Sequence, residues 1–208
     1  VVKYKDIPED MVNAVVSLED QKFWKHHGFN FTRMLGAIKD GLTGGGISGT
    51  STVTQQLARN VFLPEEKSER TLSRKITEAY YTIVLEKKLS KEQIMEAYLN
   101  TIYLGFNSYG IQAASQAYFS KDVKDLDTLE CAALAALPQA PDSYALVYAD
   151  YGNSGSSLPQ LSTSGSATYF YNGDISKDRR ELVLKNMESF GFITSEQHTE
   201  ALNDDLKK

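Results

Sequence analysis

Signals for the start of a helix recur along the chain and constrain its fold more than any other feature. At residues 90–93, 127–130 and 194–197, a short polar residue is followed three positions later by Glu or Gln. This pairing satisfies two N–H groups that a helix leaves unpaired at its start. Apolar residues then recur at helical spacing, as over residues 94–102, whereas strand signals are few. The sequence therefore predicts a mainly α protein.

Length and charge narrow the class of protein further. The chain has 208 residues, of which 41% are hydrophobic and 24% charged, so it has room for one large domain or two small ones. We expect one domain over residues 1–208. The net charge of −5 argues against nucleic-acid binding, for which a basic domain is expected. The single cysteine, Cys131, lies in an apolar helical run and is expected to be a buried small hydrophobe.

The sequence contains neither a signal peptide nor an uninterrupted apolar run of transmembrane length. We therefore expect these residues by themselves neither to span a bilayer nor to carry an export address. The abrupt first residues leave open that the chain is a piece of something larger.

A helical run that ends in two carboxylates, within residues 17–28, is the first candidate for chemistry. The apolar stripe through Val12 and Val15 continues to Glu19, so this side chain should leave the helix on its inward side. The helix dipole and desolvation both disfavour the anion there, which makes a carboxylate more basic. The alternative is an ordinary surface pair with Lys22.

A glycine-rich stretch follows, with five glycines among residues 41–49. We expect a mobile loop that orders over a ligand, because glycine permits many backbone conformations. The lysine of a phosphate-binding P-loop is missing and the glycine spacing fits neither nucleotide fingerprint, so nucleotide binding is excluded.

Residues 49–60 are denser in hydroxyls, amides and cations than a core helix needs. We expect Ser51 or Thr52 to cap a helix there, which leaves a polar face within one or two turns. That face suits sugar hydroxyls or phosphate oxygens, and a solvated helix with a capping residue is the alternative. Its members are Gln55, Gln56, Arg59 and Asn60.

Residues 59–91 form a locally basic segment, with eight Lys or Arg against five Glu. Over residues 71–88 the helical spacing predicts a buried apolar stripe and a separate polar face. The expected stripe is Leu72, Ile76, Ala79 and Ile83, and the polar face is Thr71, Arg74, Lys75, Glu78 and Thr82. Glu78 could orient two cations onto a diphosphate or bind a metal beside it; the alternative is intrahelical salt bridging.

Residues 152–173 differ in composition from the rest of the chain. Twelve of these twenty-two residues are Gly, Ser or Thr, and none is charged. We expect a long mobile loop or an insertion over about residues 150–175.

Together these stretches resemble the peptidoglycan glycosyltransferases of family 51, which form the polymerising domain of bifunctional class A penicillin-binding proteins and of monofunctional transglycosylases. Five blocks carry the resemblance, in order: Glu19-Asp20 with Phe23, His27 and Gly28; Gly49 with Ser51-Thr52 and Gln55-Gln56; Arg74-Lys75 with Glu78; Tyr98-Leu99-Asn100 with Tyr103 and Gly105; and Arg179-Arg180. Two departures are Arg59, where the family often has Lys, and the Ser/Gly-rich stretch before Arg179.

The resemblance implies a lysozyme-like, mainly α single domain at the extracytoplasmic face of the bacterial cytoplasmic membrane. It implies polymerisation of lipid II into β-1,4-linked glycan with inversion and release of undecaprenyl diphosphate. Glu19 is then the general base, and Glu78 holds the basic residues that stabilise the diphosphate. The implied substrate-binding residues are Asp20, Phe23, Ser51, Thr52, Gln55, Gln56, Arg59, Arg70, Arg74 and Lys75.

The resemblance also implies partners and cofactors. The partners are lipid II, the growing glycan chain and the membrane surface, with a fused transpeptidase domain and a transmembrane anchor outside this chain and no nucleic acid. A divalent cation, Mg or Mn, is possible through Glu78, and no organic cofactor is expected. Moenomycin, a phosphoglycolipid, is expected to bind as a donor mimic.

Two other functions stay open on the residues alone. A lytic transglycosylase or muramidase shares a Glu-centred core but cleaves glycan and has less need of a cation cluster. A glycan-binding scaffold module would leave an inward Glu19 and the paired cations unexplained.

Overall fold

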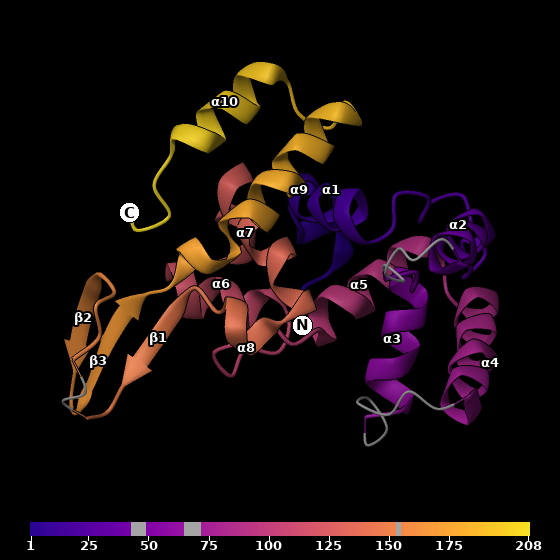
Figure 1. Cartoon of the computed structure of the whole chain (residues 1–208), viewed down its shortest axis with the longest axis horizontal. Helices are drawn as coiled ribbons and strands as arrows, with labels where there is room; N and C mark the ends of the chain where they lie inside the picture. The colour runs from indigo at the N-terminus through magenta and orange to yellow at the C-terminus, as the bar shows by residue number, and fades with distance from the viewer. Residues whose placement is uncertain (43–48, 65–71, 153–154) are drawn as a thin grey trace. The chain divides into compact units, whose positions relative to one another are not determined.

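A computed structural model describes residues 1–42, 49–64, 72–152 and 155–208 and confirms the mainly α architecture (Figure 1). Internal contacts group the chain into two compact units. Unit 1 comprises Val1–Leu18 and Ile102–Lys208, and unit 2 comprises Glu19–Thr101. Among the described residues no helix is long and apolar enough to cross a membrane.

Unit 1 is built around a fully buried helix. Helix α7 (Thr128–Ala136) is buried from Leu129 to its last residue and packs against α9 (Lys177–Ser189) and α10 (Ser195–Asn203) (Figure 1). Cys131 lies inside α7, as predicted, and burial raises the pKa of its thiol well above the usual value. The remaining helical elements are η1 (Tyr4–Asp6), α1 (Glu9–Glu19), α6 (Ile111–Phe119), η2 (Val123–Asp125), η3 (Leu137–Gln139), α8 (Pro141–Tyr144) and η4 (Gly173–Ser176).

Polar contacts hold α1 within unit 1. Thr128 at the start of α7 donates its hydroxyl to Asp10 Oδ2 at 2.5 Å, and Asn186 on α9 donates Nδ2 to the carbonyl oxygen of Ser17 at 3.1 Å. The part of α1 that belongs to unit 1 is thus tied to α7 near its first residue and to α9 near its last.

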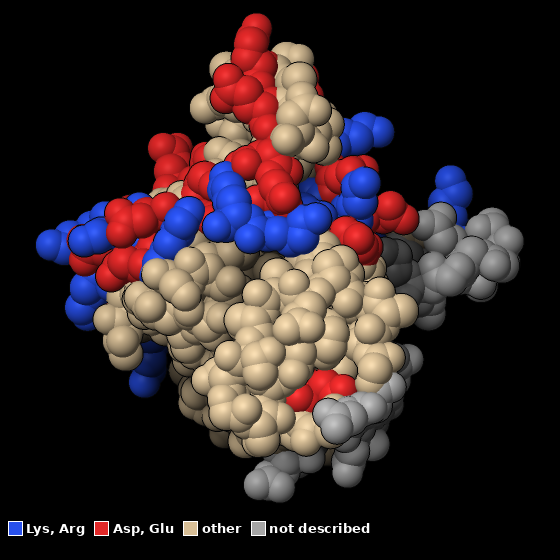
Figure 2. Space-filling view, turned by 90° about the vertical axis from the view of Figure 1, so that its left-hand side faces the viewer, with Lys and Arg blue, Asp and Glu red and all other residues tan. Residues whose placement is uncertain are grey.

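The prediction of a loop or insertion over about residues 150–175 is wrong in part, because much of this stretch is β-structure. Strands β1 (Val147–Asp150), β2 (Gln160–Ser164) and β3 (Ala167–Tyr171) form an antiparallel sheet in the order β1-β3-β2. Thr and aromatic residues favour strands, and Gly165, at φ +58°, lies in the tight β2–β3 turn. Figure 2 shows this side of the molecule, where a broad area is almost without charged residues.

Unit 2 contains the residues of the first three sequence blocks and Tyr98-Leu99-Asn100 of the fourth. Its helices are α2 (Phe31–Leu42), α3 (Val53–Phe62), α4 (Leu72–Lys88) and α5 (Lys91–Thr101). Helix α3 packs against both α4 and α5, so residues on its different faces meet different partners (Figure 1). The predicted capping box of Ser90 and Gln93 is confirmed, with both reciprocal bonds present. Within the glycine-rich stretch 41–49, residues 43–48 lie outside the described residues.

The orientation of α4 is opposite to the prediction. Its apolar stripe faces outward, with Leu72 77%, Ile76 64% and Ile83 45% exposed. Its polar face is inward, where Arg74, Glu78 and Thr82 are buried. The physical reason is that an ion pair with α3, described below, draws Glu78 toward the packed side of the helix. Leu35 on α2 is likewise 68% exposed.

Candidate active site

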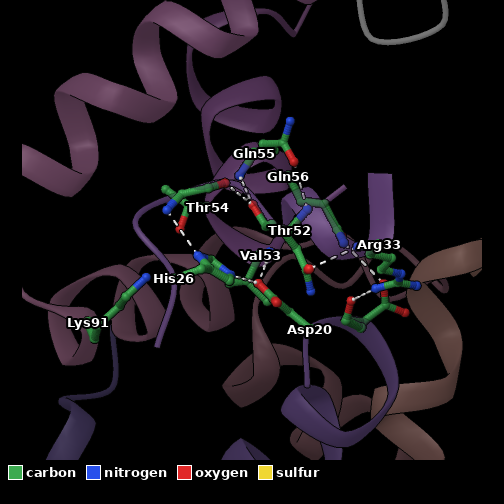
Figure 3. Close-up of polar contacts among 12 residues, drawn as sticks. Asp20, His26, Arg33, Thr52, Val53, Thr54, Gln55, Gln56 and Lys91 are labelled. Carbon is green, nitrogen blue, oxygen red and sulfur yellow. Dashed lines mark hydrogen bonds and ion pairs between the residues drawn. The ribbon is translucent and has the colours of Figure 1, made fainter. Parts of the chain in front are cut away.

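Glu19, the last residue of α1, is held at two points within unit 2. Its carboxylate oxygen Oε2 accepts a hydrogen bond from Nε2 of Gln56 on α3 at 3.0 Å. Its backbone carbonyl, which a helix end leaves without an intrahelical partner, accepts from Nη1 of Arg33 on α2 at 2.6 Å (Figure 3). Glu19 is half-buried, so its carboxylate combines fixed orientation with access.

Gln56 is itself anchored on its other side. Its carbonyl oxygen Oε1 accepts from the hydroxyl of Tyr98 on α5 at 3.2 Å. Both ends of the Gln56 amide therefore have protein partners, which gives this residue a positioning role in addition to the predicted contact with substrate.

A buried hydrogen-bond network fixes the start of α3 beside Glu19 (Figure 3). Asp20 is 1% exposed, and its Oδ2 accepts from the backbone N–H of Val53 at 3.0 Å and from Nε2 of His26 at 2.7 Å. Nδ1 of His26 accepts from the Gly28 N–H at 3.0 Å, so the ring proton is assigned to Nε2. Asp20 thus caps α3 from outside the helix, at the positive end of its dipole.

The Thr52 side chain also fixes the start of α3. Its hydroxyl donates to the carbonyl oxygen of Gly28 at 2.6 Å and accepts from the Gln55 N–H at 3.1 Å. Gln55 in turn accepts from the Thr52 N–H at 2.9 Å, which confirms the predicted cap at this helix start. Gly28, at φ +95°, cannot be replaced cheaply, because a Cβ there would lie 2.7 Å from Cγ2 of Thr82.

Three residues expected to bind substrate are instead part of the interior. Asp20 and Thr52 are buried and use their side chains in the α3 junction, and Phe23 is completely buried. Nζ of Lys91 lies 4.7 Å from the centroid of the Phe23 ring, and the same nitrogen pairs with Oε1 of Glu86 at 2.7 Å. Contact of these three residues with substrate stays a prediction, which their burial does not favour.

Glu78 on α4 is surrounded by cations, as the sequence suggested. This carboxylate has no exposed surface, and it lies 2.8 Å from Nε of Arg59, 2.9 Å from Nζ of Lys75 and 3.6 Å from Nη1 of Arg74. Burial alone would raise the pKa of Glu78, but the hydrogen bonds from Arg59 and Lys75 hold it below its usual value. Arg59 also donates Nη2 to the Ser51 hydroxyl at 3.1 Å.

The cations differ in how far they reach solvent. The Lys75 side chain is 46% exposed and that of Arg59 is 22% exposed, whereas Arg74 is only 6% exposed. An anionic ligand can therefore meet Lys75 and Arg59 directly. Arg70, the fourth predicted cation, lies outside the described residues.

The surroundings of Glu78 do not fit a divalent cation. Both of its carboxylate oxygens already face positively charged nitrogens, which would repel a metal. Among the described residues there is no group of three or more His, Cys, Asp or Glu able to hold one. The structure therefore favours side-chain cations as the partners of Glu78, and a divalent cation stays a prediction.

Three residues support Glu19 and α3 without having been predicted to do so: Arg33, His26 and Tyr98, of which Tyr98 was named only within the fourth sequence block. Each acts through a contact over six or more positions in the sequence, so no local pattern pointed to it. The Arg179-Arg180 block serves structure in unit 1. Arg179 donates to the carbonyl oxygen of Ala136 at 3.0 Å, and Arg180 donates to that of Gly173 at 3.0 Å.

Comparison with known proteins decides the family. The family model described as Transglycosylase matches residues 1–188 of this chain. The chain belongs to the transglycosylase family. Membership confirms the predicted enzyme class and the resemblance seen in the five sequence blocks. The family match ends at residue 188, and a single domain over residues 1–208 stays a prediction.

The relatives of this transglycosylase domain are much longer proteins. Penicillin-binding protein 1A from Clostridium tetani is 48% identical over 97% of this chain and 23% of the relative. The proteins of the same name from Aquifex aeolicus and Clostridium botulinum are 42% and 41% identical, over 99% and 100% of this chain and 25% and 23% of theirs. The chain thus spans about a quarter of the length of the curated relatives it matches.

A solved structure, that of penicillin-binding protein 1A from Haemophilus influenzae, aligns with a TM-score of 0.47 at 21% identity. The alignment covers 98% of this chain and 17% of that one.

Proposed function

We propose that this transglycosylase domain polymerises lipid II into β-1,4-linked glycan strands of peptidoglycan. One observation carries the proposal: α3 links a positioned carboxylate to a cation cluster. Gln56 on α3 donates to Glu19, and Arg59, one turn further on, pairs with Glu78. Residues three apart on a helix lie side by side on its surface, so a general base and an anion site lie along one helix face.

The proposed reaction uses these two parts in one displacement. The C4 hydroxyl oxygen of the acceptor sugar forms a bond to C1 of the donor while the bond from C1 to the diphosphate oxygen breaks. The hydroxyl proton passes to the Glu19 carboxylate, and the bonding electron pair leaves with the undecaprenyl diphosphate. Attack opposite the leaving group inverts the configuration at C1.

The leaving diphosphate carries its own charge and requires no general acid. Lys75 and Arg59, the exposed cations of the cluster, would stabilise it by charge-assisted hydrogen bonds. Glu78 would hold these cations in place and has no exposed surface with which to touch substrate. A lytic transglycosylase releases no diphosphate, so the cluster favours synthesis over cleavage.

The outward stripe of α4 supports a location at the membrane surface, where lipid II lies. Leu72, Ile76, Tyr80 and Ile83 recur at helical spacing and are 77%, 64%, 62% and 45% exposed. Such a continuous apolar stripe is unusual on a surface exposed only to water. We place the domain at the extracytoplasmic face of the cytoplasmic membrane, in a longer protein with a transpeptidase domain and a transmembrane anchor, as the length of the relatives supports.

The test is to give the protein lipid II in detergent and to measure the glycan and the undecaprenyl diphosphate formed. We expect growing glycan, and Glu19→Gln should reduce turnover by about 100-fold or more with an unchanged melting temperature. Glu92→Gln, at an exposed position on α5, is the matched control and should keep full turnover. Cleavage of preformed glycan without synthesis would instead identify a lytic enzyme, and binding without turnover a scaffold module.

A further inference from the structure

We propose that Tyr98 is a positioning residue for Glu19 and acts through the side-chain amide of Gln56. This inference rests on the proposed function of Glu19 as the general base. The three groups form a continuous chain in unit 2: Tyr98 donates its hydroxyl to Oε1 of Gln56 at 3.2 Å, and Nε2 of Gln56 donates to Oε2 of Glu19 at 3.0 Å.

The chemistry of the Gln56 amide fixes which end of it faces Glu19 and which faces Tyr98. Only the nitrogen of a Gln side chain can donate, and a carboxylate can only accept. If the Gln56 amide turned over, its carbonyl oxygen would face the Glu19 carboxylate and two acceptors would repel each other. The Tyr98 hydroxyl, placed at the other end, binds the oxygen and favours the orientation that Glu19 requires.

Tyr98 is well suited to act as the fixed end of the chain. It is 1% exposed and lies on α5 among the buried residues Ile94, Met95 and Leu99. Helix α5 packs directly against α3, which carries Gln56. Gln56, in contrast, is half-buried and has three rotatable side-chain bonds, so without an anchor it would sample several orientations. The buried Tyr98 ring therefore holds the Gln56 amide in one orientation, and Gln56 in turn holds the Glu19 carboxylate.

This arrangement predicts an effect on the chemical step rather than on binding. Tyr98→Phe removes one hydroxyl and leaves the ring in the core. We expect kcat to fall by about three- to tenfold, which corresponds to the net worth of one hydrogen bond. KM for lipid II should change by less than about twofold, because Gln56, the residue that the Tyr98 hydroxyl contacts, is still present in the variant.

A double-mutant cycle tests the route through Gln56. Gln56→Met removes the donor and the acceptor while it keeps an unbranched side chain of similar length. If Tyr98 acts through Gln56, then Tyr98→Phe should not lower kcat further in the Gln56→Met background. The control is Tyr118→Phe, because Tyr118 also uses a partly buried hydroxyl, donating to the carbonyl oxygen of Leu104 at 2.8 Å in unit 1. This control should keep wild-type kcat.

A readout that does not depend on turnover separates this inference from the proposed function. The side-chain NH₂ of Gln56 should give slowly exchanging, well-dispersed signals in ¹H–¹⁵N spectra, which Tyr98→Phe should broaden or shift and Tyr118→Phe should not. A wild-type kcat in Tyr98→Phe, equal losses in both backgrounds, or unchanged Gln56 signals would each overturn the inference. If the wild-type protein fails to polymerise lipid II but the Gln56 signals respond as expected, the proposed function fails and the contact chain stands.

Discussion

Nε of Arg59 lies 2.8 Å from Oε2 of Glu78, and this contact joins α3 to α4 through a carboxylate with no exposed surface. A buried charge is tolerated only when its partners compensate for lost hydration. Here Lys75 provides a second contact, at 2.9 Å from Oε1. The contact therefore explains both why α4 turns its polar face inward and why Arg59 and Lys75 remain fixed beside Glu78.

Glu78→Gln should destabilise the protein by about 3 kcal/mol or more at neutral pH, because it leaves the buried Arg74 and the partly buried Arg59 without their counter-ion. Burial raises the pKa of Glu78, yet the bonds from Arg59 and Lys75 hold it below the usual 4.5. Because the native pKa is lowered, the stabilisation is complete above the unfolded-state pKa of about 4.5 and is lost as the pH falls from there through the native pKa. Urea unfolding at several pH values measures this difference.

The difference in unfolding free energy between wild type and Glu78→Gln should accordingly shrink as the pH falls below about 4.5. Glu92→Gln on the surface of α5 serves as the control and should show little destabilisation. A difference that stayed constant down to the lowest measurable pH would show that the ionised form of Glu78 does not stabilise the fold.

Lys75→Ala and Arg74→Ala should differ in whether they mainly affect ligand binding or the stability of the fold. Because Lys75 is 46% exposed and Arg74 only 6%, the first change should mainly weaken ligand binding and the second should mainly lower stability. We expect Lys75→Ala to weaken moenomycin binding by about tenfold, the loss of one charge-assisted hydrogen bond. Isothermal titration of moenomycin measures binding by both variants, and thermal melting measures their stability. Equal effects of the two variants on binding would contradict this prediction.

Asp20→Ala should destabilise the fold by about 2 kcal/mol or more, because two buried donors, on Val53 and His26, lose their acceptor. Asp122→Ala is a matched control: Asp122 accepts from the Lys124 N–H in an exposed turn of unit 1, and its loss should cost about 1 kcal/mol or less. Chemical denaturation measures both. Normal stability of Asp20→Ala combined with a raised KM would restore the original interpretation of Asp20 as a substrate-binding residue.

Local chemistry was sufficient to predict the helix starts. The capping boxes at Thr52, Ser90, Asp127 and Thr194 each involve residues three apart, so their contacts are set by spacing alone. The general-base candidate was likewise visible, because its place on the apolar side of a helix end follows from periodicity. The hydrogen bonds that hold Glu19, from Arg33 to its backbone carbonyl and from Gln56 to its carboxylate, join residues 14 and 37 positions apart and have no local signature.

The wrong predictions for α4 and for residues 152–173 have the same origin. The spacing of Leu72, Ile76 and Ile83 correctly placed them on one face of α4, but the buried face was chosen by hydrophobicity alone. The partner that brings Glu78 inward, Arg59, lies on another helix. Similarly, the composition of residues 152–173 favoured a loop. The structure there depends on strand pairing between distant residues, such as Val147 and Tyr171, which composition does not reveal.

The apolar stripe of α4 provides the last prediction, a test of the proposed membrane contact. Ile76→Asn and Ile83→Asn should each weaken binding to phospholipid vesicles by about tenfold or more, because burial of one such side chain stabilises by about 1.5 to 3 kcal/mol. Leu182→Asn is the control, since Leu182 is 44% exposed on α9 in unit 1 and lies outside the stripe. Vesicle co-flotation measures the partition of each variant. If the three variants bind alike, or if the wild type does not bind, then the stripe does not contact the lipid and another partner covers it.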